Sequence, residues 1–161
     1  MAVLRLERID VGPLRVEAVV RVAEQKFART AAIPQLADRV LELLPGLSRH
    51  SCENGSAHGI AAELADTETP HLLEHIAFEL MALSGSPRTL KGETAWDFSA
   101  DGAGVYRVRL AYDNDLVALG ALKAGAGIVE WLFAGATPET GVGSTKAPDV
   151  DALVQTLRRL R

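Results

Sequence analysis

A short run of the sequence combines two histidines and a carboxylate at helical spacing. His71 and His75 are four residues apart, and Glu74 completes the pattern His-x-x-Glu-His. Residues four apart are neighbours one turn apart on a helix, so one cation can accept a nitrogen from each imidazole. A carboxylate beside such a cation can take a proton from metal-bound water, whose pKa falls to about 7. The run therefore predicts a hydrolytic zinc centre, with His71 and His75 as ligands and Glu74 as the general base.

The third ligand is not fixed by this pattern. The loop 48–66, which leads into the motif, contains His50, Cys52 and His58. Cys52 would supply a thiolate that balances the charge of the ion, so we take it as the expected third ligand. His50 is a neutral alternative, and Glu130 is another, because two antiparallel helices would bring it toward the motif. Each of these residues also has a purely structural interpretation, such as a buried free thiol for the cysteine.

The helix that must hold the motif has clear start and stop signals. Thr69 suits the N-cap, Pro70 suits the first helical position, and Gly85 followed by Pro87 suits the end. These signals predict a helix over residues 70–84.

The two sides of this expected helix differ in chemistry. Because successive residues turn by about 100°, His71, Glu74, His75 and Phe78 share one side, with Glu79 at its margin. The opposite side carries the apolar residues Leu72, Leu73, Ile76, Leu80 and Leu83. Since the apolar side is sufficient for packing on a core, we expect the polar side to face water or a cleft.

The remaining sequence predicts two strand pairs and several helices. Residues 3–9 and 14–22 are rich in β-branched residues, and 94–98 and 104–112 form a second pair of expected strands. Besides 70–84, helices are expected over about 34–44, 60–64, 114–133 and 149–160. Such a pattern predicts a single α+β domain over residues 1–161, in which helices pack on one face of an antiparallel sheet.

Composition excludes several other functions. The 161-residue chain has a net charge of −4, so the positive field that dominates nucleic-acid affinity is missing and we expect no such partner. Its one cysteine, Cys52, cannot form an internal disulfide, and the N-terminal residues lack the apolar core of a signal peptide. Charged residues interrupt the apolar stretches before the ~20 residues of a membrane span. We therefore expect a cytoplasmic protein without a membrane span.

Two weaker features concern glycines. Gly120, Gly125 and Gly127 lower helix propensity in the expected helix 114–133 but permit close packing against a neighbour, which would allow a homo-oligomer. The segment Gly141-x-Gly143, followed by Ser-Thr-Lys146, is similar to part of a phosphate-binding loop. It lacks the strand, loop and helix context of that motif, so we expect a flexible loop.

Several separated motifs resemble the N-terminal domain of cyanophycin synthetases over about residues 40–125. They are Leu44-Pro-Gly-Leu47, His50-x-Cys52-x-x-Gly55, Gly59, His71-x-x-Glu74-His75-x-Ala77-x-Glu79-Leu80, Gly85 and Gly104-Val-Tyr106-x-Val108 with Tyr112. In that family the domain precedes two nucleotide-dependent domains that polymerise aspartate and arginine. Neither fits within this chain, so we expect no synthesis of the polymer.

The resemblance implies the role of the N-terminal domain alone. That domain binds the polymer, and in some members it resembles a metallopeptidase-type hydrolase that cuts the chains. Carried over by residue, His71 and His75 would be metal ligands and Glu74 the general base, whereas His50 and Cys52 match the family's His-x-Cys positions. One departure weakens the expectation of polymer recognition, because Pro87-Arg-Thr-Leu-Lys-Gly92 replaces a basic Phe-Gly-x-Thr-Arg stretch.

The central motif is also similar to the inverted zinc motif of pitrilysin-type peptidases and to that of S-ribosylhomocysteine lyases. This similarity implies a metallohydrolase fold of that type. In pitrilysin-type enzymes the third ligand is a glutamate far downstream. Asp149 and Asp151 lie at a comparable distance here, although both also suit the start of the last helix.

Three functions follow as hypotheses. The first is a metal-dependent hydrolase of peptide or isopeptide bonds, with a peptide or an Asp-Arg polymer as substrate. The second is a non-catalytic module that binds a polymer or a protein. The third, a lyase of the ribosylhomocysteine type, shares the two histidines but resembles less of the chain.

Overall fold

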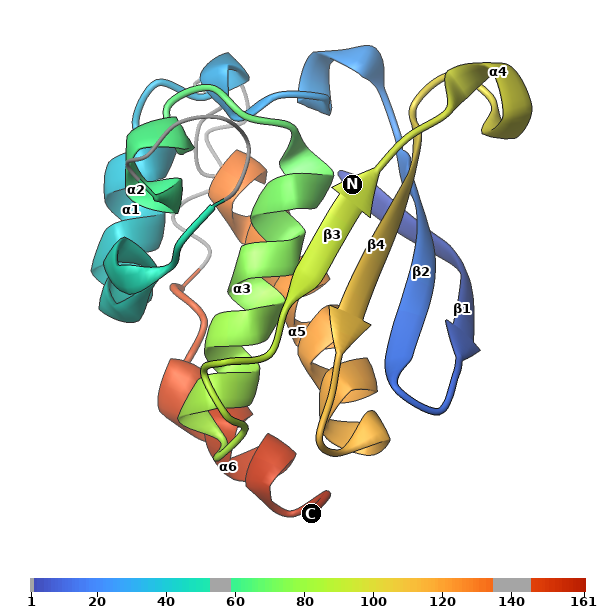
Figure 1. The fold of residues 1–161 in the computed structure, drawn as a ribbon. Coiled ribbons are helices and arrows are strands. Elements are labelled where there is room, and N and C mark those ends of the chain that lie inside the picture. Colours follow the sequence, from blue (N-terminus) through green and yellow to red (C-terminus); the bar gives the residue numbers. More distant parts are fainter. Residues whose placement is uncertain (1, 53–58, 135–145) are drawn as a thin grey trace.

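A four-stranded antiparallel sheet organises the protein (Figure 1). The computed structural model describes residues 2–52, 59–134 and 146–161. The strands lie in the order β1 (Leu4–Val11), β2 (Arg15–Val22), β4 (Val105–Ala111) and β3 (Gly92–Ala95). β1 and β2 form a hairpin, and β2 then pairs with β4, so that β1 and β3 form the two edges.

The longest helices, α3 (Thr69–Leu83) and α5 (Asp115–Ala134), pack against one face of this sheet (Figure 1). The other helical segments are the 3₁₀ turns η1 (Gln25–Phe27), η2 (Thr30–Ala32) and η3 (Pro45–Arg49), and the helices α1 (Leu36–Leu43), α2 (Ile60–Glu63), α4 (Phe98–Asp101) and α6 (Val150–Arg158). The arrangement confirms the predicted α+β class and the antiparallel sheet.

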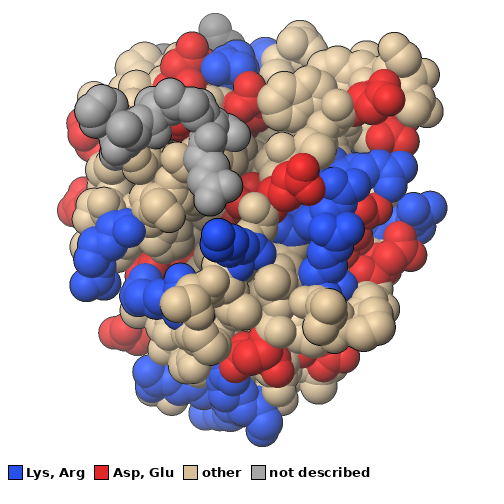
Figure 2. Space-filling model, in the orientation of Figure 1, with Lys and Arg blue, Asp and Glu red and all other residues tan. Residues whose placement is uncertain are grey.

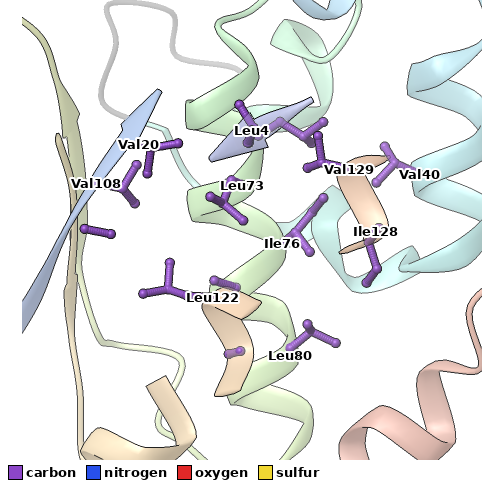
Figure 3. Packing of buried hydrophobic residues seen from close by; sticks show 14 of the residues in the cluster. Leu4, Val20, Val40, Leu73, Ile76, Leu80, Val108, Leu122, Ile128 and Val129 are labelled. Carbon is purple, nitrogen blue, oxygen red and sulfur yellow. The ribbon is translucent and has the colours of Figure 1, made fainter. Parts of the chain in front are cut away.

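The core lies between the sheet and the helices. Figure 3 shows Val20 and Val108 of the sheet turned toward Leu73 of α3 and Leu122 of α5, and all four are buried. Alternate residues of β2 and β4 point the other way, as the two-residue period of a strand requires. That outer face is charged, because Arg107 and Arg109 of β4 form ion pairs there with Glu17 of β2, and Arg107 also pairs with Asp101.

Two glycines of α5 permit close helix packing, as the sequence predicted. A Cβ at Gly125 would lie 3.0 Å from a methyl carbon of Leu73, and one at Gly120 would lie 2.7 Å from a methyl carbon of Leu157 in α6. Among the described residues nothing lies within 4 Å of a Cβ built at Gly127, so this third glycine makes no close contact within the chain.

Helix α5 bears on the expectation that no apolar stretch spans a membrane. It has 20 residues, and by length and composition it is apolar enough to cross a membrane. After Asp115 its charged residues are Lys123 and Glu130, which interrupt the apolar run as the sequence predicted. Half of its most apolar window is buried within the protein. A buried core helix meets the same criterion, so composition alone does not identify α5 as a membrane span.

The predicted boundaries are shifted at two places near the candidate site. α3 begins at Thr69 rather than after it, because the Thr69 hydroxyl donates to the carbonyl of Phe27 at 2.5 Å and does not cap the helix. β3 ends at Ala95, whereas the sequence predicted a strand through Phe98. The Asp97 side chain accepts hydrogen bonds from two backbone N–H groups and starts helix α4 there.

Candidate metal centre

Three potential ligand atoms converge at the first turns of α3. The Nε2 atoms of His71 and His75 are 3.2 Å apart, and the Cys52 Sγ atom is 3.5 Å from Nε2 of His71. All three ligand atoms lie within 4.8 Å of one another. The fold therefore brings the expected third ligand, Cys52, from the loop before α2 to the two histidines.

Two of the three distances between these atoms fit a tetrahedral zinc ion. With Zn–N distances of about 2.0–2.1 Å and a Zn–S distance of about 2.3 Å, tetrahedral angles separate two nitrogens by about 3.3 Å. The same geometry separates a nitrogen from a sulfur by about 3.5 Å. The distances between His71 and His75 and between His71 and Cys52 agree closely with these values. One thiolate and two imidazoles also form a donor set that zinc accepts, and the set leaves one position open.

The other ring nitrogen of each histidine is held by a hydrogen bond. His71 Nδ1 lies 2.9 Å from the Thr67 hydroxyl, and His75 Nδ1 lies 3.1 Å from Nδ1 of His50. Such outer bonds fix the orientation of metal-binding imidazoles. His50, the neutral alternative for the third ligand, thus contacts the ring nitrogen of His75 that points away from the cluster.

Behind His50 lies a buried carboxylate. Nε2 of His50 is 2.7 Å from Oε2 of Glu79, and the two terminal guanidinium nitrogens of Arg88 donate to Glu79 at 2.9 and 3.2 Å. Only 1% of the Glu79 side chain is exposed. Burial alone would raise the pKa of Glu79, but the hydrogen bonds from His50 and Arg88 outweigh it and lower the pKa to about 2. The carboxylate is therefore ionised at neutral pH.

Glu74, the expected general base, lies between α3 and β3. The Thr94 hydroxyl donates to its Oε2 atom at 2.5 Å. Burial raises the pKa of Glu74 to about 7, with a further contribution from the charge of Glu93 and an opposing one from the Thr94 hydrogen bond. A carboxyl group with this pKa can accept and return a proton near neutral pH.

Both histidines of the motif are in the form that binds metals. Burial, followed by the neighbouring His71 and His50 rings, lowers the pKa of His75 to about 3. Burial also lowers the pKa of His71, against the charges of Glu63 and Glu68. Both rings are therefore neutral at pH 7, and a neutral imidazole has a lone pair available for a metal.

These residues open into a cleft of about 410 Å³ between the 49–52 segment, α3 and β3. Its lining includes the motif residues together with charged side chains from η3, from the segment after α3 and from β3: Arg49, Arg88, Lys91 and Glu93. Figure 2 shows basic and acidic side chains close together on the face that carries α3 and β3. The polar side of α3 thus faces a cleft, as predicted, while its apolar side faces the core.

Not every sequence candidate reaches this site. Glu130, one of the alternatives for the third ligand, neither lines the cleft nor belongs to the ligand cluster of the described residues. The physical reason is that α5 packs on the apolar side of α3, where its Gly125 faces Leu73. Asp149 instead caps α6 by accepting from the Ala152 N–H. Within the described ranges, neither Asp149 nor Asp151 joins the cluster.

Other predictions fall on segments outside the described residues. They concern His58 and the glycines of the 141–143 segment.

Sequence reasoning missed four residues around the centre. The sequence placed Glu79 only at the margin of the polar side. Its position one helical turn after His75 could have indicated that it lies close to the motif. Arg88 lies in the stretch that departs from the family pattern. Thr67 and Thr94 gave no signal in the sequence, because their roles depend on how the loop before α3 and the strand β3 are placed.

The site and fold together define an α+β domain with a three-residue cluster able to hold a metal ion. A family model described as the cyanophycin synthase-like N-terminal domain matches residues 17–134, and the chain belongs to this family. The matched segment runs from β2 to α5 and contains Cys52, His71, Glu74 and His75. No curated protein matches the chain.

Proposed function

We propose that the protein is a metal-dependent hydrolase of peptide or isopeptide bonds, with zinc held by His71, His75 and Cys52. The observation that carries the proposal is the convergence of these three ligand atoms within 4.8 Å of one another, beside a buried carboxylate in a cleft. When bound, zinc would polarise the scissile carbonyl and lower the pKa of a water molecule to about 7.

The residues of the cleft have separate roles in the proposed reaction. Glu74 takes a proton from the attacking water and returns it to the leaving amine, a task suited to its pKa of about 7. The Thr94 hydroxyl holds one oxygen of this carboxylate and so orients the other. The buried imidazoles of His71 and His75 stay neutral and available as ligands.

The position of β3 supports a peptide as substrate. β3 is an edge strand, and the Lys91 carbonyl accepts from the Ala111 N–H at its start. Hydrogen bonds to β4 then recur at alternate residues, so the N–H and C=O groups of Gly92 and Thr94 point toward the open edge. An extended peptide can pair with such an edge, and here it would lie beside Glu74. An Asp-Arg polymer is the first substrate to test, because of the family to which the chain belongs.

The test is a comparison of wild type with Glu74→Gln. Zinc-loaded protein would be incubated with Asp-Arg polymer and with a panel of short peptides, and released amines would be quantified. We expect Glu74→Gln to keep its metal and to lower turnover on the order of 10²–10⁴-fold, since the general base is lost. Full activity in this variant would show that Glu74 is not the base. Release of a thiol from a ribosylhomocysteine-type substrate would instead support the lyase hypothesis.

A further inference from the structure

We propose that Arg88, Glu79 and His50 form a hydrogen-bond chain that fixes the His75 proton on Nδ1 and so keeps the Nε2 lone pair directed at the metal position. The three residues are positioning residues, since they act through His75. Their importance for zinc rests on the proposed function, but the tautomer of His75 is a property of the metal-free protein and can be measured without it.

The first step is the direction of the bonds at Glu79. A guanidinium has only N–H donors, and Arg88 donates to both carboxylate oxygens of Glu79. The ionised carboxylate can only accept. The contact of 2.7 Å with His50 must therefore be a hydrogen bond in which Nε2–H of His50 donates.

The second step is the direction of the hydrogen bond between His50 and His75, which depends on the bond between His50 and Glu79. When His50 carries a single ring proton, its placement on Nε2 leaves Nδ1 of His50 as an acceptor. Nδ1 of His75 lies 3.1 Å from that acceptor. Beside such a singly protonated His50 it donates, which places the His75 proton on Nδ1 and leaves Nε2 with a lone pair.

His71 reaches the same tautomer by a separate route. The Thr67 hydroxyl donates to the Glu68 carboxylate at 3.3 Å, so its oxygen accepts from Nδ1–H of His71. The Nε2 atoms of His71 and His75 then face each other at 3.2 Å, each with a lone pair and without a proton between them. Two acceptors at this distance repel each other, and either a metal ion between them or a proton on one Nε2 would remove the repulsion.

The turn η3 holds the hydrogen-bond chain of Arg88, Glu79 and His50 in place through the backbone. A Cβ at Gly46 would lie 1.9 Å from Oε1 of Glu79, so only glycine lets this turn close over the carboxylate. His50 follows the turn directly, and its N–H donates to the Leu47 carbonyl. One short segment therefore both covers Glu79 and presents His50 to His75.

The alternative is that Arg88 and Glu79 only tie the loop after α3 to the helix. Such a structural role would affect stability but would leave the His75 proton where it is. The position of the ring proton therefore separates the two explanations.

The experiment is ¹⁵N NMR of the histidine rings in metal-free protein, followed by zinc titration. In the wild type we expect His75 to show a protonated Nδ1 and an unprotonated Nε2. In His50→Ala and in Glu79→Ala we expect His75 to become a mixture dominated by the Nε2–H form. Zinc affinity should fall by about 10–100-fold in both variants.

Glu17→Ala is the matched control, because Glu17 is also an arginine-paired carboxylate but lies on the outer face of the sheet. It should leave both the tautomer and the zinc affinity unchanged. Backbone amide spectra would establish that each variant is folded. If Glu79→Ala does not fold, His50→Ala tests the chain by itself, since His50 lies at the end of a surface turn.

Two results would overturn the inference. One is a wild-type His75 protonated on Nε2, and the other is an unchanged tautomer and zinc affinity in His50→Ala. A wild type that has the expected tautomers but does not bind zinc would support the hydrogen-bond chain and contradict the proposed function.

Discussion

Two arginine-paired carboxylates, one on the outer face of the sheet and one on the polar side of α3, differ mainly in their access to water. Glu17 on β2 accepts from Arg107 and Arg109 of β4, and 21% of its side chain is exposed. Glu79 on α3 accepts from Arg88 and His50, and only 1% is exposed. The donors are similar, so the comparison isolates the effect of burial.

Burial changes what a charged pair can do. At an exposed site water replaces a lost partner, and such pairs contribute about 0–1 kcal/mol. At a buried site a lost partner leaves a polar group without compensation, which costs about 3–5 kcal/mol. The ion pairs on the outer face therefore stabilise a solvated surface only weakly. The buried Glu79 instead sets the direction of the hydrogen bond from His50, next to the candidate metal site.

The largest effect on stability is expected from Glu79→Ala. It removes the acceptor for both Arg88 and His50 inside the protein, so we expect the free energy of unfolding to fall by about 3 kcal/mol. The lower end of the range applies because the Arg88 side chain is 45% exposed and can turn to solvent. Urea unfolding followed by circular dichroism measures the change. A loss as small as that of an exposed pair would contradict the importance of burial.

Gly46→Ala tests the same carboxylate from its other side. The added methyl group would meet Glu79, which Arg88 and His50 hold in place, so we expect a loss of about 1–3 kcal/mol. Gly127→Ala is the matched control, because its Cα faces open space in helix α5. There alanine should leave stability unchanged or raise it by up to about 1 kcal/mol. Equal effects at the two glycines would refute the close contact at Gly46.

The pH dependence of Glu79 gives a third test. Its pKa is about 2 in the folded protein, below its ordinary value of 4.5, so the unfolded chain binds the proton more tightly. The stability contributed by the carboxylate is present above pH 4.5 and is lost as the pH falls toward 2. The stability difference between wild type and Glu79→Gln should therefore shrink over this interval. A difference that stays constant from pH 6 to pH 3 would contradict the lowered pKa.

The smallest effect is expected from Glu17→Ala. Arg107 keeps Asp101 as a partner and Arg109 keeps Glu93, and all four side chains reach solvent. We expect a loss of about 1 kcal/mol or less in the free energy of unfolding, measured by the same urea titration. A loss as large as that of Glu79→Ala would show that burial does not explain the difference between the two regions.

Local rules predicted the parts of the site that lie on one helix. The spacing of His71, Glu74 and His75 placed them on one side of α3, and the apolar residues between them placed the opposite side on the core. Cys52 was named from its chemistry and its place in the preceding loop. The fold class followed in the same way from strand and helix periodicity.

Features that depend on tertiary packing were not predictable in this way. Glu130 was expected near the motif because α5 was taken to approach the start of α3, but the contact through Gly125 lies on the apolar side. Thr69 was expected to cap α3, yet its hydroxyl bonds to Phe27, which is 42 residues away. The hydrogen-bond chain from Arg88 to His75 likewise joins three separate segments, and no local sequence pattern predicts contacts between distant segments.

The central claim is that His71, His75 and Cys52 hold zinc, and elemental analysis tests it most directly. Wild type would be purified without a metal-affinity tag, supplied with zinc and dialysed, alongside His71→Ala/His75→Ala and the control Glu130→Gln. The account predicts near-stoichiometric zinc in the wild type and in Glu130→Gln, and its loss in the double variant. Absence of zinc from the wild type, or equal zinc in the double variant, would contradict the account.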